Sequence, residues 1–156
     1  MHLAGTNPES LVIGVDKSAA RLARAPEEAA RRKNLLLLRA DSSHFLRLLV
    51  EEGWRLSRHY ILYPNPWPKP GHLKRRWHGH PVFPFLLRAG GTLELRSNWR
   101  LYLEEMQTAL EIAGVPSRLE PLALQASPMT AFEAKYHASG HDLWQLSANR
   151  VARHKE

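Results

Sequence analysis

Short β-prone runs alternate with helical segments along this chain, and that alternation constrains the fold more than any other feature. The runs cover residues 11–15, 35–38, 58–63 and 92–96. Their length and their content of branched apolar residues are typical of strands buried within a parallel sheet. Helices between successive strands then predict an α/β fold, with a mostly parallel sheet and helices on both of its faces.

Residues that commonly cap helices mark where the helical segments begin. Ser18, either Ser42 or Ser43, and Asn98 each stand just before such a segment. A short helix is also expected over residues 83–87, and an alternating run over residues 142–149 predicts a late strand. The 156 residues, of which 44% are hydrophobic, are sufficient for a single domain, which we assign to residues 1–156.

Positive charge is concentrated in the middle of the chain. The net charge is +7, which favours polyanionic partners. Residues 53–93 contain no Asp or Glu, and their seven cations are Arg55, Arg58, Lys69, Lys74, Arg75, Arg76 and Arg88. Charge runs are often only solvated surface, but the complete absence of carboxylates over this span favours a site for a polyanion.

Cysteine is absent, which excludes disulfides, thiolate metal sites and cysteine nucleophiles. No apolar run approaches the length of a membrane span, and the first residues lack the pattern of a signal peptide. We therefore expect a cytoplasmic protein that does not contact membranes.

A loop of prolines and aromatic residues, joined to a basic cluster, follows the third expected strand. It reads Pro64-Asn65-Pro66-Trp67-Pro68-Lys69, and His72-Leu73-Lys74-Arg75-Arg76 comes soon after. Enzymes with α/β folds place their chemistry at strand ends, and clustered cations suit a substrate that carries phosphate. The loop therefore indicates an enzyme acting on nucleic acid, with a solvated helix start as the simpler alternative for the cations.

Two expected strands end in an acid, Asp16 after the first and Asp41 after the second. In doubly wound folds an acid at this place commonly holds the two hydroxyl groups of a ribose, because a carboxylate can accept from both. Each acid could equally serve only as a helix cap.

Taken together, these motifs resemble the bacterial tRNA (guanine-N7-)-methyltransferase family. The resemblance extends from about Leu11 to Leu146, with the motifs in the family's order. Besides the loop and the basic cluster, they are Gly14-Val15-Asp16, Gly90-Gly91, Ser97-Asn98-Trp99 with Tyr102 and Glu105-Met106, the run Thr130-Ala131-Phe132-Glu133-Ala134-Lys135, and the stretch from Gly140-His141 to Trp144.

The resemblance implies a Rossmann-like class I fold, S-adenosyl-L-methionine as the cofactor, and methyl transfer to guanine N7 in the variable loop of tRNA. Asp16 would hold the cofactor ribose, Asp41 would lie by its adenine, and Asn65 would sit where the cofactor meets the target base. The residues that would contact tRNA are Lys69, Gly71, His72, Leu73, Lys74, Arg75 and Arg76. Those that would contact the substrate nucleotide are Asn98, Thr130, Ala131, Phe132 and Glu133.

The chain departs from the family in two ways. The family usually has Asp where this chain has Asn65 and Asn98, and each change could cost about 1–3 kcal/mol of recognition or rate. The family also has a first strand and a glycine-rich loop before the helix that leads into Leu11, and we expect both to be missing here. Their absence would leave the strands at Leu11 and Tyr60 each with an unpaired edge and would weaken cofactor binding.

Alternatives remain for both function and site. The chain could be a non-catalytic RNA-binding paralogue of the same family, or, on the weaker evidence of Asn65-Pro66-Trp67, an amino-group nucleic-acid methyltransferase. Histidines 72, 78 and 80, or 137 and 141, could suggest a metal site, but methyl transfer from a sulfonium needs no metal and we expect none. Thr130 and Glu133 also fit a helix capping box. The sequence does not distinguish a monomer from a homodimer.

Overall fold

The computed structural model describes residues 2–25, 27–123 and 128–150. The chain divides into two compact units, an N-terminal unit (Met1–Leu48) and a C-terminal unit (Leu49–Glu156). Helix α4 (Ser42–Glu51) contains the boundary between them. None of the helices in the described part of the chain is long and apolar enough to cross a membrane.

The N-terminal unit is built on a two-stranded parallel sheet. Its elements are α1 (His2–Thr6), β1 (Val12–Asp16), α2 (Ala19–Leu22), α3 (Glu27–Arg31) and β2 (Leu35–Arg39), followed by α4. β1 and β2 pair in register from Val12 opposite Leu35 to Asp16 opposite Arg39. Both strands therefore end at the same edge of the sheet, where the expected cofactor residues begin.

Two helix caps in this unit can be compared with the sequence analysis. Ser18 caps α2 as expected, because its Oγ accepts a hydrogen bond from the backbone N–H of Arg21 at 3.2 Å. The expectation that Ser42 or Ser43 caps α4 is wrong. Oδ1 of Asp41 accepts from the N–H groups of Ser43 (2.9 Å) and His44 (3.1 Å), since a carboxylate binds these free donors better than a hydroxyl.

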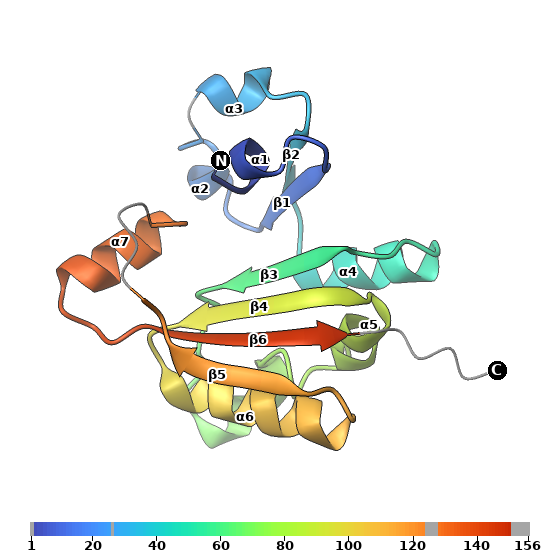
Figure 1. Cartoon of the computed structure of the whole chain (residues 1–156), viewed down its shortest axis with the longest axis vertical. Helices are drawn as coiled ribbons and strands as arrows, with labels where there is room; N and C mark the ends of the chain where they lie inside the picture. Colours follow the sequence, from blue (N-terminus) through green and yellow to red (C-terminus); the bar gives the residue numbers. More distant parts are fainter. Residues whose placement is uncertain (1, 26, 124–127, 151–156) are drawn as a thin grey trace. The chain divides into compact units, whose positions relative to one another are not determined.

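The C-terminal unit is built on a four-stranded sheet. Its elements are β3 (Arg58–Leu62), the 3₁₀ helix η1 (Pro70–Arg75), α5 (Phe83–Arg88), β4 (Gly91–Ser97), α6 (Arg100–Ile112), β5 (Ser117–Pro121), α7 (Ala131–Ala138) and β6 (Trp144–Arg150). The strand order is β3-β4-β6-β5. β3 and β4 are parallel, and Figure 1 shows their arrowheads pointing the same way, whereas β6 runs against both β4 and β5.

In the described residues, β1 pairs only with β2, and β3 pairs only with β4. β1 and β3 are therefore edge strands of their respective sheets. These are the same two strands that the sequence analysis expects to have an unpaired edge.

Helix α6 packs along one face of the four-stranded sheet (Figure 1). Its buried stripe consists of Tyr102, Leu103, Met106 and Leu110. Across from this stripe, the inward-facing residues of β4 and β6 include Leu93, Leu95 and Leu146, each at most 1% exposed. This apolar layer is the core of the C-terminal unit.

Asn98 does not cap α6, contrary to the sequence analysis. The cap position is Trp99, which makes no side-chain capping bond. Instead, the N–H of Trp99 donates to Oγ of Ser97 at 3.0 Å. The side chain of Asn98 is thereby left out of the helix and remains at the strand end.

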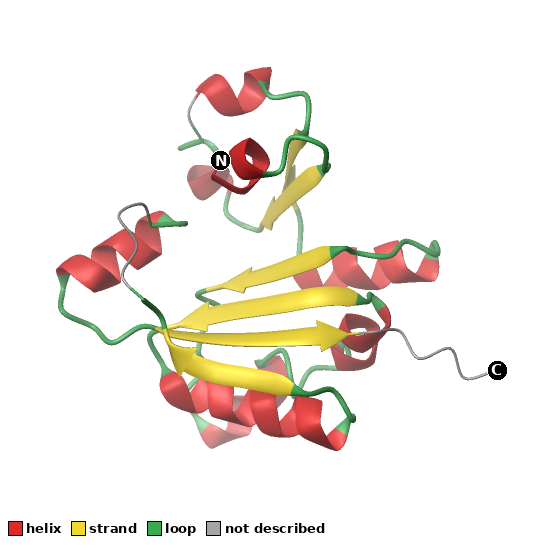
Figure 2. Cartoon of the chain, viewed as in Figure 1, coloured by secondary structure: helices red, strands yellow, loops and turns green. Residues whose placement is uncertain are grey.

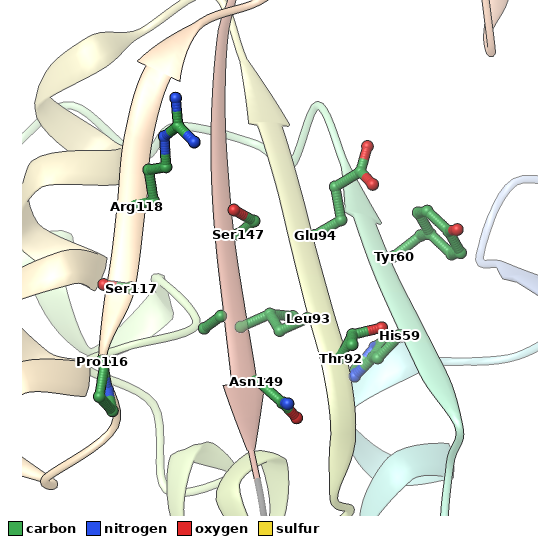
Figure 3. Close-up of a pocket in the computed structure, with 11 residues that line it drawn as sticks. His59, Tyr60, Thr92, Leu93, Glu94, Pro116, Ser117, Arg118, Ser147 and Asn149 are labelled. Atoms are coloured by element: carbon green, nitrogen blue, oxygen red, sulfur yellow. The ribbon is translucent and has the colours of Figure 1, made fainter.

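The opposite face of the four-stranded sheet carries polar side chains (Figure 3). They line a shallow hollow of about 460 Å³, and include Tyr60, Thr92, Glu94, Arg118, Ser147 and Asn149. None of the residues that the sequence analysis assigns to a site lines this hollow. The candidate site lies instead in the loops after the strands, drawn in green in Figure 2.

Candidate active site

The two expected cofactor acids stand at the ends of adjacent parallel strands. Asp16 is the last residue of β1, and its Oδ1 accepts from the backbone N–H of Ser18 (2.7 Å) and from Arg21 (2.9 Å). Asp41 comes two residues after the end of β2. The structure therefore places both acids at one edge of the N-terminal sheet.

Asp41 is held as a carboxylate by its surroundings. Burial opposes its ionisation, but hydrogen bonds from Lys17, Ser43 and His44, together with the charge of Lys17, outweigh burial and keep its pKa well below the usual range. Lys17 directly follows β1, so its ion pair with Asp41 ties the two strand ends together.

In the C-terminal unit, Asn65 and Asn98 follow the neighbouring parallel strands β3 and β4. Both side chains therefore belong to the carboxyl edge of the sheet, where α/β folds bind ligands. Asn65 is exposed, and its Oδ1 accepts from the N–H of Trp67 at 3.3 Å. Nδ2 of Asn98 lies 3.3 Å from Nδ1 of His141, which comes just before β6.

Helix α7 is attached to the same edge by a buried ion pair. Arg96, near the end of β4, donates from Nη1 to Oε1 of Glu133 at 2.7 Å, and each residue is only 5% exposed. Oγ1 of Thr130 accepts from the N–H of Glu133 at 3.0 Å, so Thr130 is the cap of α7. The other Glu133 oxygen accepts from the N–H of Met129. The segment Thr130–Glu133 is thus both a helix cap and a neighbour of the strand end.

Aromatic contacts connect the loops at this edge. The ring of Tyr136 lies 5.7 Å from Tyr63, which directly follows β3, and 5.2 Å from His141. Phe132, which is 39% exposed, stacks on Tyr136 at 6.3 Å. Burial and the nearby charge of Glu133 raise the pKa of Tyr63 above its usual range, so the phenol stays neutral.

Most of the expected tRNA-contact residues lie on the surface. Lys69, Gly71, Leu73, Lys74 and Arg75 are exposed, and His72 is half-buried. Two of these residues flank the ring of Trp67, with the guanidinium of Arg75 at 4.6 Å from its centroid and the ring of His72 at 5.4 Å. The loop and η1 therefore form one packed unit that presents its cations outward.

Arg76 differs from the other members of the basic cluster. It is 4% exposed, and its guanidinium donates to both carboxylate oxygens of Glu105 and to the backbone carbonyls of Trp67 and Pro68. Sequence alone did not reveal this placement, because a run of Lys and Arg is ordinarily a surface feature.

The histidines of the loop region face separate partners. Nε2 of His78 bonds to Glu105 at 2.8 Å, the ring of His72 packs on Trp67, and Nδ1 of His80 accepts from the N–H of Val82 at 3.1 Å. Across the described residues, no three His, Asp or Glu side chains are grouped so that they could hold a metal ion.

The sequence analysis did not single out Glu94 and Arg96, and it named His78 and Glu105 without the partners that they have in the structure. Arg96 and Glu94 occur in a strand where alternation alone indicates only which face each residue takes. Glu105 was noticed as part of a motif, but its spacing from Arg76 carries no local signal. Such long-range ion pairs become visible only once the strands and α6 are placed.

Comparison with known proteins identifies the family. Residues 1–146 match the family model described as "Putative methyltransferase". The chain belongs to this methyltransferase family. Because the match includes both units, the strand-end residues of each fall within it.

Curated relatives carry a more specific name. A tRNA (guanine-N(7)-)-methyltransferase of Chromohalobacter salexigens is 31% identical over 95% of this chain and 65% of its own length. The protein of the same name from Cronobacter sakazakii is 29% identical over 97% of this chain and 67% of its own length. The chain therefore spans about two thirds of the length of these relatives.

Solved structures confirm the expected fold. The 16S rRNA methyltransferase KamB is 17% identical and superposes with a TM-score of 0.67 over 96% of this chain and 81% of its own. The antibiotic-resistance methyltransferase Kmr is 24% identical, with a TM-score of 0.60 over 97% of this chain and 80% of its own. The chain has the Rossmann-like α/β fold of class I S-adenosylmethionine-dependent methyltransferases.

Proposed function

We propose that this chain transfers a methyl group from S-adenosyl-L-methionine to N7 of a guanine in tRNA. One observation carries the proposal. Asn65 and Asn98 follow the carboxyl ends of the neighbouring parallel strands β3 and β4, Glu133 bonds to Arg96 near the end of β4, and the loop that contains Asn65 carries exposed cations. The names of the curated relatives support the choice of tRNA guanine as the substrate.

The residues of the N-terminal unit fit the cofactor. Within the described residues, both bonds to the Asp16 carboxylate use Oδ1, which leaves Oδ2 to accept from a ribose hydroxyl. Asp41 already caps α4 and pairs with Lys17. Its role would therefore be to shape the wall beside the adenine rather than to bond to it.

The chemistry requires positioning more than proton transfer. Guanine N7 is a neutral lone pair in the plane of the base, so no general base has to remove a proton before it attacks. When bound, S-adenosylmethionine supplies an electrophilic methyl group on a positively charged sulfur. The task left to the protein is to orient the base, which Asn65 and Asn98 can do through their amide oxygens.

The exposed cations of the loop supply affinity for the tRNA backbone. Lys69, Lys74 and Arg75 can each replace a counterion on phosphate, a contribution that does not depend on sequence. Base contacts at the sheet edge would then select the guanine. We place this reaction in the cytoplasm, where tRNA is available.

Transfer of labelled methyl to tRNA tests the proposal, followed by digestion to nucleosides and chromatography. We expect label in 7-methylguanosine. Label in a methylated exocyclic amino group would support the amino-group methyltransferase instead. If the chain binds both tRNA and the cofactor but transfers nothing, the non-catalytic RNA-binding paralogue would be the better description.

A further inference from the structure

The guanidinium of Arg76 is enclosed by protein acceptors. Nε and Nη2 donate to the carbonyl oxygen of Trp67 at 3.1 and 2.9 Å, and Nη1 donates to the Glu105 carboxylate at 2.7 Å. The ring of Trp99 lies under it, 5.1 Å from Cζ. Arg76 is buried, whereas the Glu105 side chain is 30% exposed, so a phosphate could reach this guanidinium only by displacing Glu105 and the carbonyl of Trp67.

The carbonyl that Arg76 binds belongs to a strained turn. Trp67 has a φ of +46° and Tyr63 a φ of +51°, both in the left-handed region that residues with a β-carbon avoid. A residue with a β-carbon is strained in this region and persists there only where its surroundings hold it in place. Two hydrogen bonds from Arg76 to the Trp67 carbonyl are the contacts suited to hold this turn.

The far end of this arrangement is anchored in the core of the C-terminal unit. Glu105 lies on α6, next to buried residues of that helix, and also bonds to Nε2 of His78 at 2.8 Å. The hydroxyl of Tyr102, one turn earlier on α6, accepts from the N–H of Trp77 at 2.8 Å. Three consecutive residues, 76–78, are thus fastened to one rigid helix.

We propose that Arg76 is a positioning residue, which clamps the Asn65–Lys69 turn onto α6 and does not itself bind phosphate. The inference rests on the proposed function, because the turn matters only if Asn65 and its neighbouring cations face RNA. It divides the basic cluster by role. Lys69, Lys74 and Arg75 bind the backbone, and Arg76 sets where they stand.

Substitutions at Arg76 and Glu105 distinguish positioning of the turn from binding of phosphate, because the two roles predict different effects on tRNA binding. Arg76→Lys keeps the positive charge but cannot bridge a carbonyl and a bidentate carboxylate. Glu105→Gln makes the protein more positive, so electrostatics alone predicts tighter tRNA binding, whereas loss of the clamp predicts weaker binding. Glu104→Gln is the matched control, since Glu104 adjoins Glu105 and, among the residues that the structure describes, its side chain forms an exposed pair with Arg100.

Two measurements on the full chain read out these variants. Hydrogen exchange over residues 63–72 should quicken in Arg76→Lys and Glu105→Gln but not in Glu104→Gln. Filter binding of tRNA should weaken by about tenfold in the first two variants, the effect of losing one charge-assisted hydrogen bond. The salt slope should also fall in Arg76→Lys despite its unchanged charge, because the displaced cations release fewer counterions.

Unchanged exchange and an unchanged salt slope in Arg76→Lys would overturn the clamp, as would tighter tRNA binding by Glu105→Gln. If the unmodified chain binds no tRNA, the proposed function fails, and the exchange measurement still decides whether the clamp exists. Circular dichroism of each variant shows whether the fold is retained. If Arg76→Lys does not fold, Glu105→Gln carries the test alone.

Discussion

The ion pair between Arg96 and Glu133 is the most buried charge contact among the described residues. Its removal tests how much a single ion pair contributes to the stability of the C-terminal unit. We expect Arg96→Leu to lower the free energy of unfolding by about 3–5 kcal/mol, because it leaves the buried carboxylate of Glu133 without its cation. Glu94, whose side chain is 23% exposed, also loses its 2.7 Å bond to Arg96. Urea unfolding followed by tryptophan fluorescence measures this.

All five tryptophans lie in the C-terminal unit, so the fluorescence signal reports the unit that contains Arg96. Arg118→Leu serves as the control, since Arg118 forms a surface pair with Glu120 and its side chain is 79% exposed. The control should change stability by less than about 1 kcal/mol. Equal effects of the two substitutions would mean that the buried pair does not anchor α7.

Asn98 is the residue whose chemistry bears most on the choice of substrate. Asn98→Asp should raise or preserve methyl transfer to tRNA guanine, because a carboxylate accepts from both donors of the guanine edge and stabilises the developing positive charge. Asn149→Asp, on the exposed face of β6, is the control for the added negative charge. A marked loss of transfer in Asn98→Asp alone would indicate that the amide is suited to another base or amino group.

At the scale of elements, the attachment of residues 76–78 to α6 makes the C-terminal unit sensitive to acid. Burial lowers the pKa of His78, although Glu105 acts against it. The reason is visible in the geometry. Nε2–H of the neutral ring donates to Glu105, while Nδ1 is buried and has no hydrogen-bond partner in the described residues, so a second proton there would find no acceptor. Burial opposes ionisation of Glu105, but bonds from Arg76 and His78 outweigh it and lower its pKa.

Both shifts act in the same direction on stability. The unfolded chain takes up a proton at His78 once the pH falls below about 6.5, and at Glu105 below about 4.5, while the folded chain still resists both. Stability should therefore fall as pH drops through these windows. Urea unfolding at a series of pH values checks this, and His78→Gln should flatten the upper window. If His78→Gln leaves the dependence of the free energy of unfolding on pH unaltered, the attribution of the upper window to His78 is wrong.

Some strands could be predicted from the sequence and others could not. β1, β2, β3 and β4 were predicted because their apolar runs carry a local signal. β5 was not, since Ser117–Pro121 is short, contains both charges and a proline, and becomes a strand only by pairing with β6. The same difference between local signals and long-range contacts decides which features of the site could be predicted. The family resemblance named Asn65 and Asn98, which come after predicted strands, but the burial of Arg76 depends on Glu105, 29 residues away along the chain.

At the scale of the whole molecule, the expected functions divide between the two units. Asp16 and Asp41, the residues suited to the cofactor, lie in the N-terminal unit, and those suited to the tRNA lie in the C-terminal unit. The C-terminal unit has a closely packed core between its sheet and α6, whereas exposed leucines in β2, Leu36 and Leu37, mark the N-terminal unit as less enclosed.

The most direct test compares two tRNA transcripts that differ at the reacting atom. One contains guanosine and the other 7-deazaguanosine, in which carbon replaces N7 while the base-pairing edge is unchanged. At saturating S-adenosylmethionine, the account predicts equal binding of both transcripts and labelled methyl only in the first. Equal labelling of the two transcripts, or none in the guanosine transcript, would contradict methyl transfer to guanine N7.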